Sequence, residues 1–197
     1  MLFESSLNLN LKGADISYYP NFLNINEANK YFETLLDSIN WRQDEITVYG
    51  KTHLQPRLTA FYADNENTYK YSNIRMYPNP FESNLLEIKN KIETELKIKF
   101  SSCLANLYRN GSDSNGWHSD DEKELGINPI IASISLGAER IFHLKHKTDK
   151  ALKTKLILHH GSLLIMQGET QHNWLHQIPK TKKDIGKRIN LTFRIIT

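Results

Sequence analysis

Two segments in the first half of the chain carry apolar residues at the three- and four-residue spacing of an amphipathic helix. The first follows Tyr19-Pro20 and opens with Asn24 and Glu27 at the N-cap and N3 positions of a capping box. Its apolar stripe consists of Ala28, Tyr31, Phe32, Leu35, Leu36 and Ile39. The second is expected from about residue 82 to 97, with a stripe of Leu85, Ile88, Ile92 and Leu96. Both stripes predict packing against a core.

From residue 101 onward the pattern changes to short β-rich runs separated by Gly, Asn, Asp and Pro clusters. The runs are CLANLYR, PIIASISLG, RIFHLKH, TKLILHHGSLLIMQ and RINLTFRIIT. Two helices followed by many antiparallel strands favour an α+β fold whose helices brace one face of a sheet sandwich or jelly roll. Because 197 residues support one substantial core, we expect a single domain over residues 1–197, helical and hairpin-bearing over about 20–100 and β-rich over about 101–197.

The segment from residue 41 to 75 mixes aromatic, cationic and turn residues without a long apolar run. This composition predicts surface hairpins. Recognition usually resides on loops held by a rigid scaffold, so the segment is a candidate substrate platform, and an insertion without a function is the alternative. Residues 1–20 predict no element.

Composition places few limits on the partners of the chain. The formal net charge of +3 is too small to indicate a nucleic-acid partner by itself, although five cations gather between Lys180 and Arg188. The single Cys103 cannot form an internal disulfide. We find no signal-peptide pattern and no apolar stretch approaching 18 residues, and therefore expect a cytoplasmic or nuclear protein.

A candidate metal site begins at NGWHSDDE, where His118 and Asp120 stand two residues apart. Along an extended strand or turn this spacing directs both side chains to one side. A third ligand must come from a later strand, and we select His176 in WLHQIP. Two His and one carboxylate on one face of an octahedron leave the opposite face open for a co-substrate and O2. Strand geometry leaves three other histidines as rivals, namely His172, His159 and His160.

A candidate anion site lies in the C-terminal run RINLTFR, where Arg188 and Arg194 belong to a strand of alternating character. Guanidinium groups bind carboxylates bidentately, so a dicarboxylate fits there, and pairing with protein Asp or Glu is the alternative. In NLYRN, Asn106 and Tyr108 occupy alternate strand positions and can point into the same cavity. Each feature is ordinary alone, and their order along the chain makes the pattern selective.

The pieces NLYRNGSDSNGWHSDDE, SISLGAER, HGSLLIMQG, WLHQIP and RINLTFR resemble the AlkB family of Fe(II)/2-oxoglutarate nucleic-acid dealkylases, over roughly residues 40–197. The resemblance implies a double-stranded β-helix in which His118, Asp120 and His176 bind Fe(II) and act in catalysis. It implies that Arg188 takes the distal carboxylate of 2-oxoglutarate and that Arg194 lies nearer its metal-bound end. The residues that would surround the co-substrate are Asn106, Tyr108, Arg188, Asn190, Thr192 and Arg194.

The resemblance also implies a substrate surface. Lid segments that recognise nucleotides would contain Tyr49, Gly50, Lys51, Tyr69 and Tyr71, while Asp121 and Glu122 would line the substrate mouth. Tyr49 departs from the phenylalanine of related sequences, and its hydroxyl disfavours a dry, stacked position in duplex DNA. We further expect phosphates to be held by Lys51, Arg57, Lys182 and Lys183.

The implied activity is oxidative demethylation of 1-methyladenine- and 3-methylcytosine-type bases in DNA by a monomer. It would use Fe(II), 2-oxoglutarate and O2 and release formaldehyde and succinate. Three alternatives stay open: methylated RNA as substrate, a protein or small-molecule substrate, and a catalytically inactive jelly roll that binds nucleic acid.

Overall fold

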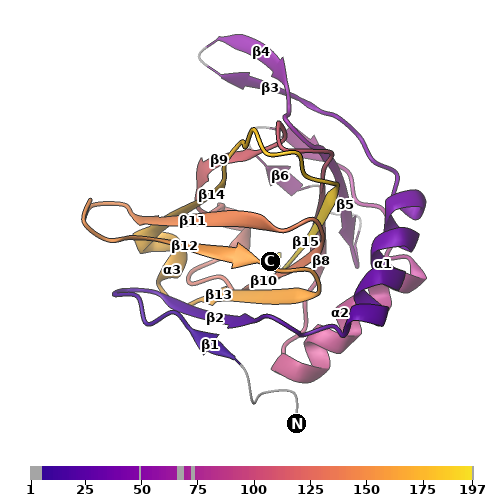
Figure 1. Cartoon of the computed structure of the whole chain (residues 1–197), viewed down its shortest axis with the longest axis horizontal. Coiled ribbons are helices and arrows are strands. Elements are labelled where there is room, and N and C mark those ends of the chain that lie inside the picture. Colours follow the sequence, from indigo (N-terminus) through magenta and orange to yellow (C-terminus); the bar gives the residue numbers. More distant parts are fainter. Residues whose placement is uncertain (1–5, 49, 66–68, 72–73, 197) are drawn as a thin grey trace.

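A seven-stranded and a four-stranded antiparallel sheet form the main body of the described structure (Figure 1). The computed structural model describes residues 6–48, 50–65, 69–71 and 74–196, and for residues 47, 48, 69–71, 74 and 75 it describes the backbone alone. In spatial order, the large sheet contains β1 (Leu7–Asn8), β2 (Asp15–Tyr19), β13 (Ser162–Gln167), β10 (Ile131–Gly137), β15 (Arg188–Arg194), β8 (Ser102–Tyr108) and β5 (Leu58–Ala63). The small sheet contains β12 (Lys153–Leu158), β11 (Arg140–His146), β14 (Trp174–Ile178) and β9 (Asn115–His118). The predicted α+β jelly roll is confirmed.

Both predicted long helices are present, and both lie on the outer face of the large sheet (Figure 1). The first is α1 (Ile25–Ser38), which begins with the expected capping box: the amide of Glu27 donates to Asn24 Oδ1, and the amide of Asn24 donates to Glu27 Oε2, both at 3.0 Å. The second is α2 (Ser83–Leu96). Their apolar stripes cover the sheet as the three- and four-residue spacing predicts.

Side-chain alternation along the central strands divides the interior into two cores. In β15, Ile189, Leu191 and Phe193 belong to the core beneath the helices. In β8, Cys103 and Ala105 join the same core. The intervening residues of both strands point into the space between the sheets. There, part of the small sheet's inner face packs against the large sheet through Phe142, Leu144, Leu158, Trp174 and Ile178.

One sequence interpretation needs correction, and one segment that was left unassigned proves to contain strands. Residues 41–75 are not hairpins throughout, because β5 is buried and pairs with β8 at the edge of the large sheet. The run LTAFYA in β5 is apolar enough for a core strand. The polar residues on either side of this run made the whole segment look like a surface region. Residues 1–20, for which the sequence predicted no element, contribute β1 and β2, and β2 pairs with β13.

Two small hairpins complete the structure, as the sequence predicted for this region. One consists of β3 (Glu45–Val48) and β4 (Lys51–Leu54), and it extends beyond the sheets in Figure 1. The other consists of β6 (Tyr69–Tyr71) and β7 (Ile74–Met76). The short helices are η1 (Lys123–Leu125) and α3 (Thr170–Asn173). No helix within the described ranges is long and apolar enough to cross a membrane.

The position of Cys103 beneath the helices makes a prediction about its reactivity. Its side chain is fully buried, and burial raises the pKa of the thiol. Because the thiolate is the reactive form, we expect no reaction with Ellman's reagent in the native protein and complete reaction in guanidinium chloride. The Cys103→Ala variant is the blank for both measurements. Rapid native labelling would contradict the burial of this strand face.

Candidate active site

Neighbouring strands of the small sheet bring the three predicted metal ligands together. His118 ends β9, His176 lies in β14, and the two residues are direct cross-strand partners. Asp120 follows two residues after His118. One candidate ligand atom from each residue lies within 4.8 Å of the others. Among the described residues, this is the group of acidic, His and Cys side chains able to hold a metal ion.

The two histidines are held in a form suited to metal binding. His118 Nδ1 lies 2.7 Å from the carbonyl oxygen of Gly116, a contact that requires a proton on Nδ1 and leaves the lone pair on Nε2. Burial lowers the pKa of His118. Burial also lowers the pKa of His176 to about 3, and the neighbouring His118 acts in the same direction. Both rings are therefore neutral at neutral pH, as coordination requires.

The carboxylate of Asp120 is fixed by two partners from other elements. Arg194 donates to Asp120 Oδ1 at 2.8 Å, and both side chains are buried. Burial acts to raise the pKa of Asp120, but Arg194 and the two histidines together bring it below its usual value. The backbone amide of Asp120 donates to Gln171 Oε1 at 2.9 Å. The aspartate is thus ionised and held in place before any ligand binds.

The rival histidines lie elsewhere and have other partners. His172 is exposed on α3. His159 lies 2.6 Å from Glu139, and Ser162 Oγ donates to the backbone carbonyl of His159, so residues 159–162 form hydrogen bonds within a turn. His160 accepts a hydrogen bond from the amide of Gly137. Neither His159 nor His160 joins the candidate metal group.

A pocket between the sheets joins the candidate metal group to the inner face of β15. The polar residues of this wall form a chain of hydrogen bonds: Thr192 donates to Asn190 at 3.1 Å, and Asn190 donates to Ser133 Oγ at 2.8 Å. All six side chains that the sequence predicted around 2-oxoglutarate line this pocket with the candidate metal group. They are Asn106, Tyr108, Arg188, Asn190, Thr192 and Arg194.

Arg188 is the strongest sign of an anionic ligand in this pocket. Its Nη2 donates to Ser135 Oγ at 2.9 Å, while its buried Nε and Nη1 have no hydrogen-bond partner among the described residues. Burial lowers the pKa of Arg188 to about 10; Tyr108, whose ring lies 5.1 Å from the guanidinium, raises it, and Arg140 lowers it further. A buried guanidinium with two unused donors is costly alone and matches the two oxygens of a carboxylate. The alternative interpretation, pairing with a protein carboxylate, applies to Arg194 and not to Arg188.

Several contacts around the pocket were missed or misassigned from the sequence. Arg57 was expected to hold phosphates, but it is buried and its Nε donates to Asn106 Oδ1 at 2.8 Å. Ser133 and Ser135 lie on the inner face of β10, and the alternation in SISLG could have indicated them. Nothing in the local sequence indicates Gln171, because its contact with Asp120 joins residues 51 positions apart.

The predicted substrate residues are only partly placed. Asp121 is exposed and accepts hydrogen bonds from Ser119 at 2.8 Å and from Lys147 at 3.1 Å. Glu122 is partly buried and precedes η1. Gly50 has a φ of 75° in the turn of the β3–β4 hairpin, where Lys51 is exposed. Tyr49 lies outside the described residues, and Tyr69 and Tyr71 are described as backbone of β6 alone.

Comparison with known proteins agrees with this geometry. The family model of the 2OG-Fe(II) oxygenase superfamily matches residues 15–194. The chain belongs to this superfamily. The residues present fit Fe(II) and 2-oxoglutarate, which the family name implies. Two neutral histidines and an ionised aspartate share a pocket with Arg188, whose buried guanidinium has two donors without a partner among the described residues.

The chain is also similar to individual members. Alpha-ketoglutarate-dependent dioxygenase alkB homolog 3 of Bos taurus is 45% identical over 186 residues, which is 90% of this chain and 64% of that protein. The Homo sapiens protein of the same name is 43% identical, over 92% of this chain and 66% of that protein. The chain thus spans just under two thirds of these relatives. DNA oxidative demethylase ALKBH2 of Homo sapiens is 35% identical, over 94% of this chain and 74% of that protein.

A solved structure supports the fold alone. The structure of OsALKBH1 superposes with a TM-score of 0.70 and covers 97% of this chain and 100% of that chain. Its sequence identity is 16%, so the likeness concerns the arrangement of the strands.

The low pKa of His176 makes a prediction for the metal-free protein. Between about pH 6.5 and the folded pKa of about 3, the unfolded chain binds a proton that the folded chain excludes. Lowering the pH through this window should therefore reduce the free energy of unfolding, by up to about 1.4 kcal/mol per pH unit from this residue. Urea titrations in EDTA at pH 5, 6 and 7 measure how the free energy of unfolding changes with pH. His176→Gln should reduce this slope by the equivalent of up to about one bound proton.

The matched control is His172→Gln, which changes an exposed histidine four residues away. This control shows whether a change in slope comes from the buried position of His176 or from the loss of any histidine in this segment. An unchanged slope in His176→Gln would mean that His176 is protonated in the folded protein.

Proposed function

We propose that this chain is an Fe(II)- and 2-oxoglutarate-dependent dioxygenase that demethylates N-alkylated bases in DNA, of the 1-methyladenine and 3-methylcytosine type. The observation that carries the proposal is a single pocket containing His118, Asp120, His176 and the incompletely bonded Arg188. The name of one similar protein, DNA oxidative demethylase ALKBH2, supports DNA as the substrate.

In this proposal His118, Asp120 and His176 hold Fe(II), since two imidazoles and a carboxylate form the donor set that suits this ion while leaving positions open. Arg188 binds the distal carboxylate of 2-oxoglutarate through Nε and Nη1. When bound, Fe(II) and 2-oxoglutarate supply the oxidising chemistry, in which O2 and the co-substrate are consumed, succinate and CO2 form, and hydroxylation of the N-methyl carbon releases formaldehyde.

The protein's own contribution is orientation and exclusion of water. Arg194 holds the Asp120 carboxylate ionised and in a fixed position. The inner faces of both sheets supply an apolar lining around the polar groups, formed by Leu104, Phe142, Leu158, Leu164, Met166 and Ile178. Asn106, Asn190 and Thr192 would contact the sides of the co-substrate. Hydrogen bonds from Asn106 and from Thr192 to Asn190 already hold these three side chains in place.

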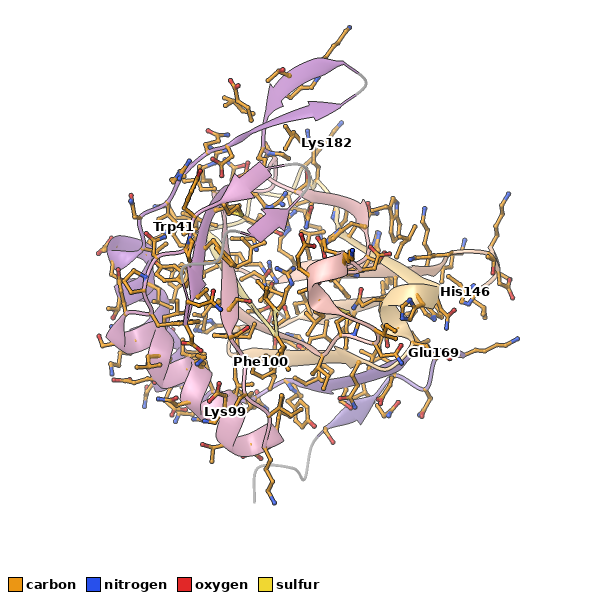
Figure 2. All side chains as sticks on the ribbon, turned by 180° about the vertical axis from the view of Figure 1, so that it is seen from behind. Trp41, Lys99, Phe100, His146, Glu169 and Lys182 are labelled. Atoms are coloured by element: carbon orange, nitrogen blue, oxygen red, sulfur yellow. The ribbon has the colours of Figure 1, made fainter. Side chains whose placement is uncertain are left out.

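The proposed substrate surface consists of the remaining predicted residues. An alkylated base must leave the stack to reach the pocket, and a base that cannot pair costs less to extrude. Methylation at a pairing nitrogen makes the ring cationic, so Asp121 and Glu122, directly after Asp120, offer complementary charge. The β3–β4 hairpin would contribute Gly50 and Lys51, and the β6–β7 hairpin Tyr69 and Tyr71. The resemblance adds Tyr49, which lies outside the described residues. Lys182, which Figure 2 shows below the β3–β4 hairpin, and Lys183 are exposed and available to phosphates.

The proposal predicts that turnover depends on Asp120. Purified protein, Fe(II), 2-oxoglutarate, O2 and a methylated single-stranded DNA oligonucleotide should yield succinate, formaldehyde and the restored base, scored by mass spectrometry. Asp120→Ala should lower base restoration by at least about a thousandfold, because the variant loses a metal ligand and leaves Arg194 buried without that carboxylate. Its circular dichroism spectrum must stay native for the comparison to hold.

Parallel reactions on methylated RNA and on a methylated peptide separate the alternatives. Succinate formed without repair of DNA, together with repair of RNA, would replace the DNA assignment by the RNA one. Absence of every product with folded, metal-loaded wild type would contradict the enzymatic proposal itself.

A second prediction concerns Arg188. Replacement by Met removes the donors to the distal carboxylate, so the KM for 2-oxoglutarate should rise at least about tenfold, as expected when hydrogen bonds to a charged group are removed. Without co-substrate, the melting temperature should stay the same or rise, because the variant removes a buried charge with two unused donors. Arg188→Lys keeps the charge without the planar fork and should give an intermediate KM. A large loss of stability with an unchanged KM would show that Arg188 has a structural role.

A further inference from the structure

Within the part of the chain that the structure describes, neither long helix covers the outer face of the small sheet, whereas both cover that of the large sheet (Figure 1). Exposure alternates along β11 and β12, and the outward residues include Ile141 and Ile157, which are 40% and 48% exposed. An uncovered sheet face with apolar side chains is a candidate binding surface.

A groove of about 430 Å³ crosses this face. Its lining residues are Trp117, His143, Leu144, Lys145, Lys153, Thr154 and Lys155, and we call it the Trp117 groove. The indole of Trp117 is 39% exposed. Lys145 Nζ lies 4.2 Å from the centroid of this ring, and the ring of His143 lies 6.3 Å away, tilted by 31°. The groove therefore presents an aromatic face bordered by cations.

The lysines of the groove are not neutralised by carboxylates of the described residues. Lys145 and Lys153 are direct cross-strand partners, and like charges in this position repel. Neither they nor Lys155 forms an ion pair with any residue that the structure describes. No carboxylate is among the described residues that line the groove. A polyanion is the ligand that this arrangement favours.

The Trp117 groove and the candidate active site lie on opposite faces of the small sheet and adjoin each other at β9. Trp117 directly precedes His118 on β9 and lines the groove, whereas His118 lines the pocket. The residue before β9, Ser114, donates its backbone amide to the carbonyl of Pro56, close to the end of β4. The groove therefore begins at the edge of the small sheet that adjoins the β3–β4 hairpin, which we propose as part of the substrate surface.

We propose that the Trp117 groove binds single-stranded nucleic acid flanking the alkylated base. One base stacks on Trp117, and phosphates lie against Lys145, Lys153 and Lys155. Aromatic stacking combined with a row of cations is how proteins hold single strands without reading their sequence. The inference rests on the proposed function for the origin of the ligand. A second copy of the chain fits less well, because it would bring the same lysines together.

Direct binding tests the groove without any turnover. Fluorescence anisotropy with an unmodified 20-nucleotide DNA strand, and separately with RNA, gives Kd for metal-free protein. Trp117→Ala should weaken binding roughly tenfold, as expected when one base loses its aromatic stacking partner, and Trp117→Phe should restore most of it. Lys153→Ala/Lys155→Ala should also weaken binding and reduce the dependence of log K on log salt by about 0.7 for each phosphate that is no longer neutralised.

The matched control removes two positive charges elsewhere. Lys30→Ala/Lys97→Ala changes two exposed lysines near the helices and should leave Kd close to that of the wild type. A control that loses as much affinity as Lys153→Ala/Lys155→Ala would show general charge attraction and would overturn the groove. So would wild-type affinity in Trp117→Ala. Equal effects on DNA and RNA would support a groove that binds phosphates and base faces.

Kinetics link the groove to the reaction. A methylated trinucleotide is too short to fill the groove, whereas a methylated 20-nucleotide strand fills it. The groove variants should therefore raise KM much more on the 20-nucleotide strand than on the trinucleotide. Failure of the proposed function is visible as no product from wild type, which leaves the anisotropy result standing. If the KM of the wild type did not depend on strand length, the groove proposal would be contradicted, and the proposed demethylase function would be unaffected.

Discussion

The alternation of side chains along β15 is the constraint on which this structure depends. Odd-numbered residues of the strand support the helices, and even-numbered residues from Arg188 to Arg194 line the pocket. A register slip of one residue would exchange the two sets, placing arginines beneath the helices and leucine in the pocket. Because β15 lies between β10 and β8, both neighbours are held to the same register. The stability of the core and the composition of the site are thus fixed together.

Buried charge is the second feature that organises the site. Arg194 and Asp120 compensate each other at 2.8 Å, so this arginine already has a carboxylate partner within the protein. Arg188 is compensated by one hydroxyl and by the nearby ring of Tyr108, and it retains unused donors. The contrast supports the different roles that we propose for two arginines on one strand: Arg194 would maintain a metal ligand, and Arg188 would bind an anion.

The sequence predicted those parts of the structure that have a local period or a compact motif. The capping box at Asn24, the two helix stripes and the alternating run RINLTFR all gave correct elements. The sequence alone could not show which histidine lies beside His118 in the sheet. The structure shows that it is His176, which is the cross-strand partner of His118. Gln171 and the burial of Arg57 could not be predicted, because each depends on contacts between distant segments. The strand β5 was missed because its polar flanks concealed a short buried run.

The most direct test is to add Fe(II) and then 2-oxoglutarate to the protein under anaerobic conditions and to record its visible absorption after each addition. The account predicts a charge-transfer band that requires both additions and saturates at one equivalent of Fe(II) per chain. It also predicts that Asp120→Ala, if folded, gives no such band. A band of equal intensity in that variant, or no band in folded wild type, would contradict the assignment of this pocket to Fe(II) and 2-oxoglutarate.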